Sequence, residues 1–155
     1  MDRLRWFLAV SFVILTTVGA MVADERGNAN DVKLMVQDAL SYIKEVGPDK
    51  AFDDFTNPGS ARWHKKDIYV FCYKLDGTCV CQGGNKALVG KNLLDMKFPD
   101  GKPQIRNMAE LAKNQGSGWL EYAWPHPQTK KVEGKRAWVN KIPGYDGFIV
   151  IGYYK

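Results

Sequence analysis

Aromatic side chains with polar tips gather in one segment of this 155-residue sequence, and they are the first candidates for chemistry. Tyr122 and Trp124 alternate along an extended stretch, so they share one face of a predicted strand. Such rings can contact the carbon skeleton of a small molecule and hydrogen-bond it through their polar atoms. We therefore interpret this face as the wall of a small-molecule pocket. The alternative is that both rings are plain core.

Three further side chains could complete this pocket. Tyr69 begins the matching aromatic face of an earlier predicted strand. His126 stands between two prolines, so its backbone is extended and its ring could reach the pocket mouth, although a lone histidine is usually a surface residue. Asn85 follows another strand and is a candidate ligand contact, but an asparagine before a turn is more often structural.

An anionic ligand would need a cation, because a desolvated carboxylate is costly unless it is paired. Lys135 and Arg136 are neighbours on a predicted strand and face opposite sides, so one of them at most points inward. Arg106, on a predicted helix that precedes the strands, is the second candidate cation.

Motifs for other chemistries are absent from the sequence. There is no GxSxG elbow, no HExxH and no signal for a paired cysteine and histidine, so we expect no enzyme and no cofactor. The two histidines are far apart in the sequence, which argues against a dedicated metal site. The net charge of +5 is scattered along the chain, which argues against nucleic acid as a partner.

The elements that must position these residues follow from periodicity and turn signals. Apolar residues recur at helical spacing, then alternate in β-branched and aromatic runs, and the turns between strands are short. The predicted class is α+β with a five-stranded antiparallel sheet. The predicted helices cover residues 32–46, 48–55 and 104–114, with one helical turn near Leu93-Leu94; the predicted strands cover 68–73, 78–82, 118–124, 132–141 and 148–154.

Three cysteines fall in the first predicted hairpin. A two-residue turn at Asp76-Gly77 would place Cys72 opposite Cys81, within cross-strand reach, with Cys79 left over. Both a Cys72–Cys81 disulfide and reduced core thiols fit this arrangement, because a register change of one residue breaks the pairing.

The first 20 residues have the pattern of a secretory signal peptide. Arg3 and Arg5 precede an apolar run over residues 6–18, and small residues lead to a predicted cut after Ala20. Cleavage would leave residues 21–155 as one domain with a net charge of +4, in the periplasm or secreted. An uncleaved membrane anchor is the alternative.

Residues 32–155 resemble the single Cache domain family, the extracytoplasmic PAS-like sensor modules of bacterial chemoreceptors and sensor kinases. The resemblance rests most on the run Gly-Trp…Tyr…Trp-Pro…Pro over residues 118–127, followed by Lys135 and the pair Trp138-Val139. It implies a long N-terminal helix packed on a curved antiparallel sheet of PAS type. It also implies a pocket between the sheet and its covering loops that binds small molecules, often short carboxylates.

The resemblance also implies roles for single residues. Lys135 becomes the inward cation and Arg136 the solvated one. Gln82 stands where family members often carry histidine; glutamine donates and accepts hydrogen bonds but cannot be protonated, so a ligand contact there would be neutral.

The chain departs from receptors of this family, since it ends at Lys155 directly after the last predicted strand. We therefore expect an exported, free-standing sensory module that binds a small organic anion without its own transmembrane output. The alternative function is an accessory protein with a vestigial pocket. It would dock on a membrane-bound sensor, or form a homodimer, through the N-terminal helix.

Overall fold

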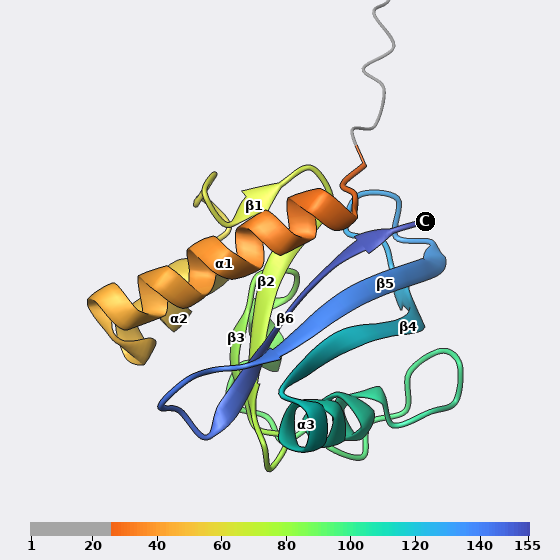
Figure 1. The fold of residues 1–155 in the computed structure, drawn as a ribbon. Helices are drawn as coiled ribbons and strands as arrows, with labels where there is room; N and C mark the ends of the chain where they lie inside the picture. Colours follow the sequence, from red (N-terminus) through yellow and green to blue (C-terminus); the bar gives the residue numbers. More distant parts are fainter. Residues whose placement is uncertain (1–25) are drawn as a thin grey trace, which may run out of the picture.

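The computed structural model describes residues 26–155, and Figure 1 shows their fold. The predicted signal peptide, residues 1–20, lies outside the described residues and stays a prediction. Within the described part no helix is long and apolar enough to cross a membrane. The same residues contain no group of three or more His, Cys, Asp or Glu side chains that could hold a metal ion.

The long helix α1 spans Ala29–Val46, and its ends follow from local chemistry. Asn28 and Asp31 form a reciprocal capping box at its start, which satisfies backbone N–H groups that the first turn leaves free. Gly47 ends the helix with φ at 85°, a conformation that glycine adopts without strain. Pro48 then opens α2, which spans Pro48–Thr56 and covers the predicted second helix.

The strands form one antiparallel sheet in the order β1-β2-β6-β5-β4, with β3 paired to β2. The predicted α+β class with an N-terminal helix on an antiparallel sheet is confirmed, and a two-residue strand β1 extends the predicted sheet at one edge. The strands are β1 His64–Lys65, β2 Ile68–Lys74, β3 Cys79–Gln82, β4 Ser117–Pro125, β5 Val132–Lys141 and β6 Gly147–Tyr154.

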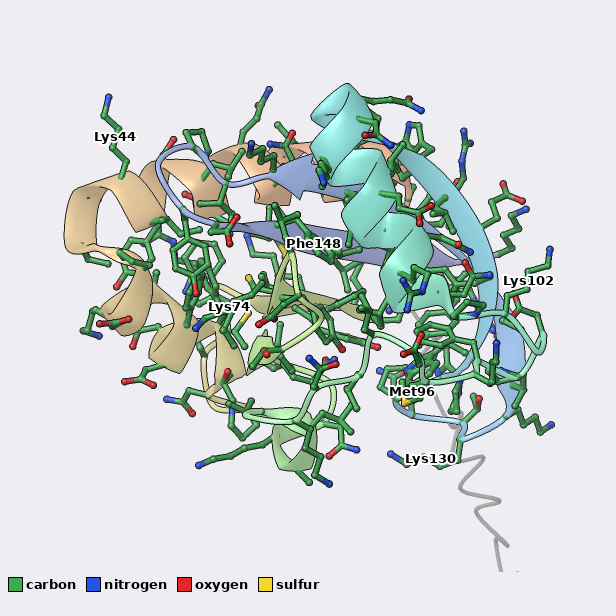
Figure 2. All side chains as sticks on the ribbon, turned by 90° about the horizontal axis from the view of Figure 1, so that it is seen from below. Lys44, Lys74, Met96, Lys102, Lys130 and Phe148 are labelled. Carbon is green, nitrogen blue, oxygen red and sulfur yellow. The ribbon has the colours of Figure 1, made fainter. Side chains whose placement is uncertain are left out.

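Helices cover both faces of this sheet. Seen from below, α3 (Gln104–Gln115) lies in front of the strands and α1 lies behind them (Figure 2). Strand alternation gives each face its own core. The face toward α1 and α2 carries the buried side chains of Val70, Cys72, Ile149 and Ile151. The residues that alternate with them along the strands point to the other face and pack with α3. The second group on the strands is Tyr69, Phe71, Tyr73, Cys79, Tyr122, Ala137, Val139, Phe148 and Val150.

The segment between β3 and α3 carries its helical turn earlier than predicted. A 3₁₀ turn spans Lys86–Leu88, capped by Asn85, whose side chain accepts a hydrogen bond from the N–H of Ala87. The turn predicted near Leu93-Leu94 is not helical, so that expectation was wrong. Leu94 instead packs against the β2–β3 turn, where a Cβ on Gly77 would lie 2.5 Å from its side chain.

The cysteines take the predicted register. Cys72 of β2 lies opposite Cys81 of β3, and both are fully buried. The structure holds all three cysteines as free thiols.

The beginning of the described chain and its end lie side by side (Figure 1). The Arg26 guanidinium donates a 2.9 Å hydrogen bond to the carbonyl of Lys155 and lies 2.8 Å from the Glu133 carboxylate of β5. The entry to α1 is therefore attached to the end of the sheet that also carries the β4–β5 turn.

Candidate functional site

A cleft of about 390 Å³ opens beside the ends of β2, β3 and β4, on the α3 side of the sheet. It brings together five of the residues predicted for the site, which come from three strands, the loop after β3 and the turn after β4. These residues are Tyr69, Gln82, Asn85, Trp124 and His126; Gly84, Leu88, Pro125, Pro127 and Lys130 complete the wall.

A second, much smaller cavity of about 10 Å³ shares Tyr69, Gln82 and Trp124 with the cleft. Its remaining wall is aromatic and includes Tyr122, whose ring meets Phe98 edge-on at 5.2 Å between centroids. We name it the inner cavity. Its volume is close to what one water molecule needs. Tyr122 therefore lines the inner cavity rather than the cleft.

Lys135 is buried against the ring of Tyr69 and is not among the residues that line the cleft or the inner cavity. It lies on β5, between Tyr122 of β4 and Tyr154 of β6, and only 1% of its surface is exposed. Its Nζ lies 3.9 Å from the ring centroid of Tyr69, 4.8 Å from that of Tyr154 and 5.4 Å from that of Phe71. No described residue accepts a hydrogen bond from this Nζ.

An ammonium in this position is unusual, because lysine is almost never fully buried unless it is paired. Cation–π attraction to three rings compensates part of the lost hydration, but it leaves the three N–H donors unused. Arg136, the next residue, is only partly buried on the opposite face and lies 3.6 Å from Glu121. The inward and outward directions predicted for this pair agree with these positions.

His126 is fully buried, although a lone histidine is usually at the surface. The β4–β5 turn folds around its ring, so that the N–H groups of Gln128 and Thr129 both donate to Nδ1 at 3.2 Å. Because Nδ1 accepts, the proton of the neutral ring is on Nε2. The ring also meets Tyr154 edge-on at 4.6 Å between centroids, so it is fixed on two sides.

Gln82 and Asn85 have partners of their own within the loop after β3. The Gln82 side-chain oxygen accepts a 3.1 Å hydrogen bond from the N–H of Gly84, and Gln82 is 5% exposed. Asn85 caps the 3₁₀ turn, so the structural role weighed for it is present together with its position on the cleft.

Arg106 does not join the other predicted residues. It lies on α3, pairs with Asp95 and is 43% exposed, and it borders a separate surface hollow with Glu110 and Lys113. The reason is helical geometry: Ile105 and Met108 face the core, and Arg106 is turned about 100° from Ile105.

Five lining residues were not among the predicted site residues, and Lys130 and Gly84 are the two with the clearest consequence for the site. Lys130 was counted among the scattered surface charges. It follows His126 by four residues across a turn that contains Pro127, and this spacing could have indicated that both residues line the cleft. Gly84 lies in the loop after β3. A Cβ on Gly84 would lie 2.7 Å from the Tyr69 ring, so glycine leaves that ring its space.

Burial favours the protonated form of two phenols beside the cleft, Tyr122 and Tyr154. It raises the pKa of Tyr122 and that of Tyr154 well above the ordinary value of 10.0. The Tyr154 hydroxyl donates a 2.9 Å hydrogen bond to the Pro125 carbonyl in the cleft wall. The site thus combines neutral donors, aromatic surface and one buried cation, a set that suits a small anion with a carbon skeleton.

Another hollow among residues 26–155 lacks this combination. A groove of about 590 Å³ between the end of α1 and the β5–β6 turn is lined mainly by apolar side chains, with Ser41, Lys44 and Tyr145 as its polar ones. It has no buried cation among its lining residues.

Comparison with solved structures finds the same fold in sensor domains. A methyl-accepting chemotaxis protein from Vibrio parahaemolyticus superimposes with a TM-score of 0.68 and 20% identity, over 81% of this chain and 86% of that one. A structure described as the basis for carboxylic acid recognition by a Cache chemosensory domain gives the same score and identity, over 81% and 91%. A periplasmic sensor domain of a chemotaxis protein follows at 0.64, with 20% identity over 81% and 88%.

Sequence comparison leads to the same family. The sensor histidine kinase MctS of Rhizobium johnstonii is 30% identical over 89 residues, which is 57% of this chain and 19% of the kinase. The matched part of this chain thus spans about a fifth of that relative. The family model for the Cache domain matches residues 59–155, which include the sheet, α3 and every residue of the cleft. The chain belongs to the Cache domain family.

Proposed function

We propose that this Cache domain binds a short organic anion, a small carboxylate, in the cleft and inner cavity. The observation that supports the proposal most is Lys135, an ammonium with 1% exposure and no hydrogen-bond partner among the described residues. A carboxylate that reached it would supply the charge-assisted hydrogen bonds that the protein does not.

The ligand's path would pass Tyr69, since this ring lines the cleft and its centroid lies 3.9 Å from the Lys135 Nζ. Tyr69 and Trp124 would enclose the carbon skeleton, and Gln82 would offer a neutral hydrogen bond. The inner cavity is small, so the ring of Tyr69 would turn aside as the carboxylate enters. This limits the ligand to a short chain.

We also propose that the domain acts outside the cytoplasm as a sensory module. The support is the pattern of a signal peptide at residues 1–20, together with family membership. The structural neighbour described as recognising carboxylic acids makes that ligand class the first to try, although at 20% identity it shares the fold alone.

The alternative, an accessory docking protein with a vestigial pocket, predicts apolar residues along the outside of α1 and a fully apolar sheet face. Leu34 on α1 is 57% exposed. The sheet face toward α3, however, buries Lys135 and Gln82. A vestigial pocket gives no reason to retain a buried cation, so we favour ligand binding.

A matched pair of probes tests the proposal. Propionate and propionamide have nearly the same shape, and they differ in charge. We expect propionate, or another short carboxylate from a panel, to raise the melting temperature, because a ligand at 100 times its Kd stabilises the native state by about 2.7 kcal/mol. The matching amide should leave it unchanged. No shift with any short carboxylate at millimolar concentration would contradict the proposal.

A further inference from the structure

Asp67 is a buried carboxylate outside the cleft, and the proposed ligand contacts do not use it. It is 1% exposed and follows Lys66, whose φ of 59° makes the tight turn between β1 and β2. One carboxylate oxygen, Oδ1, accepts a 2.7 Å hydrogen bond from the N–H of Gly27. The other, Oδ2, has no hydrogen-bond partner among the described residues.

The unpartnered oxygen faces the cleft wall. Oδ2 of Asp67 lies 3.7 Å from Nε2 of His126, which also has no hydrogen-bond partner among the described residues. Since Nδ1 of His126 accepts from two backbone N–H groups, Nε2 carries the proton and can donate to this carboxylate. The pair is a matched donor and acceptor, separated by slightly more than a hydrogen-bond length.

The other end of this contact is the entry to α1. Gly27 directly precedes Asn28, the N-cap of the helix, and it fits closely: a Cβ there would lie 2.2 Å from Ile68 and 3.1 Å from Oδ1 of Asp67. A movement of the Asp67 carboxylate would therefore be passed to the backbone at the start of the helix.

We infer that Asp67 is a positioning residue that links the cleft to the N-terminal end of α1. Its Oδ1 accepts the hydrogen bond from Gly27, and its Oδ2 lies 3.7 Å from Nε2 of His126. Ligand binding would bring His126 Nε2 within hydrogen-bond distance of Oδ2, and the carboxylate would transmit the shift through Gly27. This inference rests on the proposed function for its ligand, but the link between His126 and Gly27 exists without one.

Two variants cut the link at different ends. Asp67→Asn keeps an oxygen to accept from Gly27 but presents an amide N–H₂ to the N–H of His126, so it breaks the His126 end. Gly27→Ala breaks the other end through the clash with Ile68. Gly59→Ala is the control, since a Cβ on this exposed loop glycine approaches no atom closer than 3.4 Å.

The first measurement needs no ligand. The ring nitrogens of His126 are followed by NMR in the full chain labelled with ¹⁵N. We expect both Asp67→Asn and Gly27→Ala to shift the Nε2 signal, and Gly59→Ala to leave it unchanged. An unchanged His126 signal in folded Gly27→Ala protein would overturn the inference, whether or not a carboxylate binds. Should Gly27→Ala not fold, unchanged His126 signals in Asp67→Asn would overturn it equally.

The second measurement adds propionate and follows amide hydrogen exchange. In the wild-type protein we expect about tenfold slower exchange at Gly27 and in the first turn of α1, within the usual range of coupling between sites. In Asp67→Asn the ligand should bind while this slowing is lost. Slowing that persists in Asp67→Asn would overturn the link; absence of binding to wild type would instead contradict the proposed function.

Discussion

On the strands, the buried residues that face α1 and α2 are apolar, among them Val70, Ile149 and Ile151, whereas the face toward α3 also buries Lys135 and Gln82. The first face gains hydrophobic free energy from every residue that it buries. The second face gives up part of that gain to hold a cation without a hydrogen-bond partner. The difference separates what holds the fold together from what prepares it to bind.

The largest expected effect is on the apolar face. Ile151→Ala removes a fully buried side chain from the contact with α1, which should lower the free energy of unfolding by about 2–5 kcal/mol. Urea unfolding measures the loss. If the two faces have separate roles, the folded variant should bind a carboxylate as wild type does. A large loss of affinity without a loss of stability would break the comparison.

A smaller effect is expected at Gly84, on the wall of the cleft. Gly84→Ala places a methyl group 2.7 Å from the Tyr69 ring and would displace this ring, which also contacts Lys135. We expect about tenfold weaker carboxylate binding, or ~1.4 kcal/mol, by calorimetric titration. Stability should change less than in Ile151→Ala. Equal affinity for the variant and wild type would show that Tyr69 does not gate the site.

The pKa values of the buried thiols test whether water reaches the two faces of the sheet. Burial raises the pKa of Cys79, on the α3 side, to about 12, and it also raises that of Cys81, on the α1 side. Because the folded protein holds the Cys79 proton more tightly, this contribution to stability is present below the ordinary value of 9.0 and is lost as the pH rises toward 12.

Urea midpoints between pH 8 and 11 measure this loss. Wild type should lose up to about 1 kcal/mol more than Cys79→Ala by pH 10, because one unit of pKa is worth ~1.4 kcal/mol and partial solvation reduces the effect. The comparison of the two proteins removes the titration of other groups. Parallel curves would mean that Cys79 is solvated.

The smallest effect is expected at Arg106. Its ion pair with Asp95 is exposed and lies outside the cleft, and such pairs contribute little to stability. Arg106→Ala should therefore leave both the unfolding midpoint and carboxylate affinity unchanged. Weaker binding in this variant would place the residue in the site after all.

Strand alternation was enough to predict which side chains share a face. It correctly grouped Tyr122 with Trp124 and separated Lys135 from Arg136, because the period of two is a property of the backbone. It could not tell the cleft from the inner cavity, since Phe98, which closes over Tyr122, comes from a loop without a period.

The residues that were missed depend on contacts between distant parts of the chain. The sequence analysis assigned Asp67 no role, and its contacts are with Gly27 and His126, 40 and 59 positions away. Arg106 was misplaced for a related reason: the direction of a helical side chain depends on how the helix is rotated against the sheet. Local sequence determines neither the long-range contacts of Asp67 nor the rotation of α3 against the sheet.

Lys135 decides the central claim, that the α3 face gives up stability in order to bind an anion. The most direct measurement is the Kd for propionate, or for the best carboxylate of the panel, together with the free energy of unfolding of Lys135→Met. Lys141→Met, an exposed lysine of the same strand, is the control. We predict binding weaker by about 10–100-fold, since a hydrogen bond to a charged group is worth ~1.5–3 kcal/mol. Stability should be equal or higher, because an unpaired buried charge is removed. Affinity within twofold of wild type, or a stability loss of the size expected for Ile151→Ala, would contradict the account.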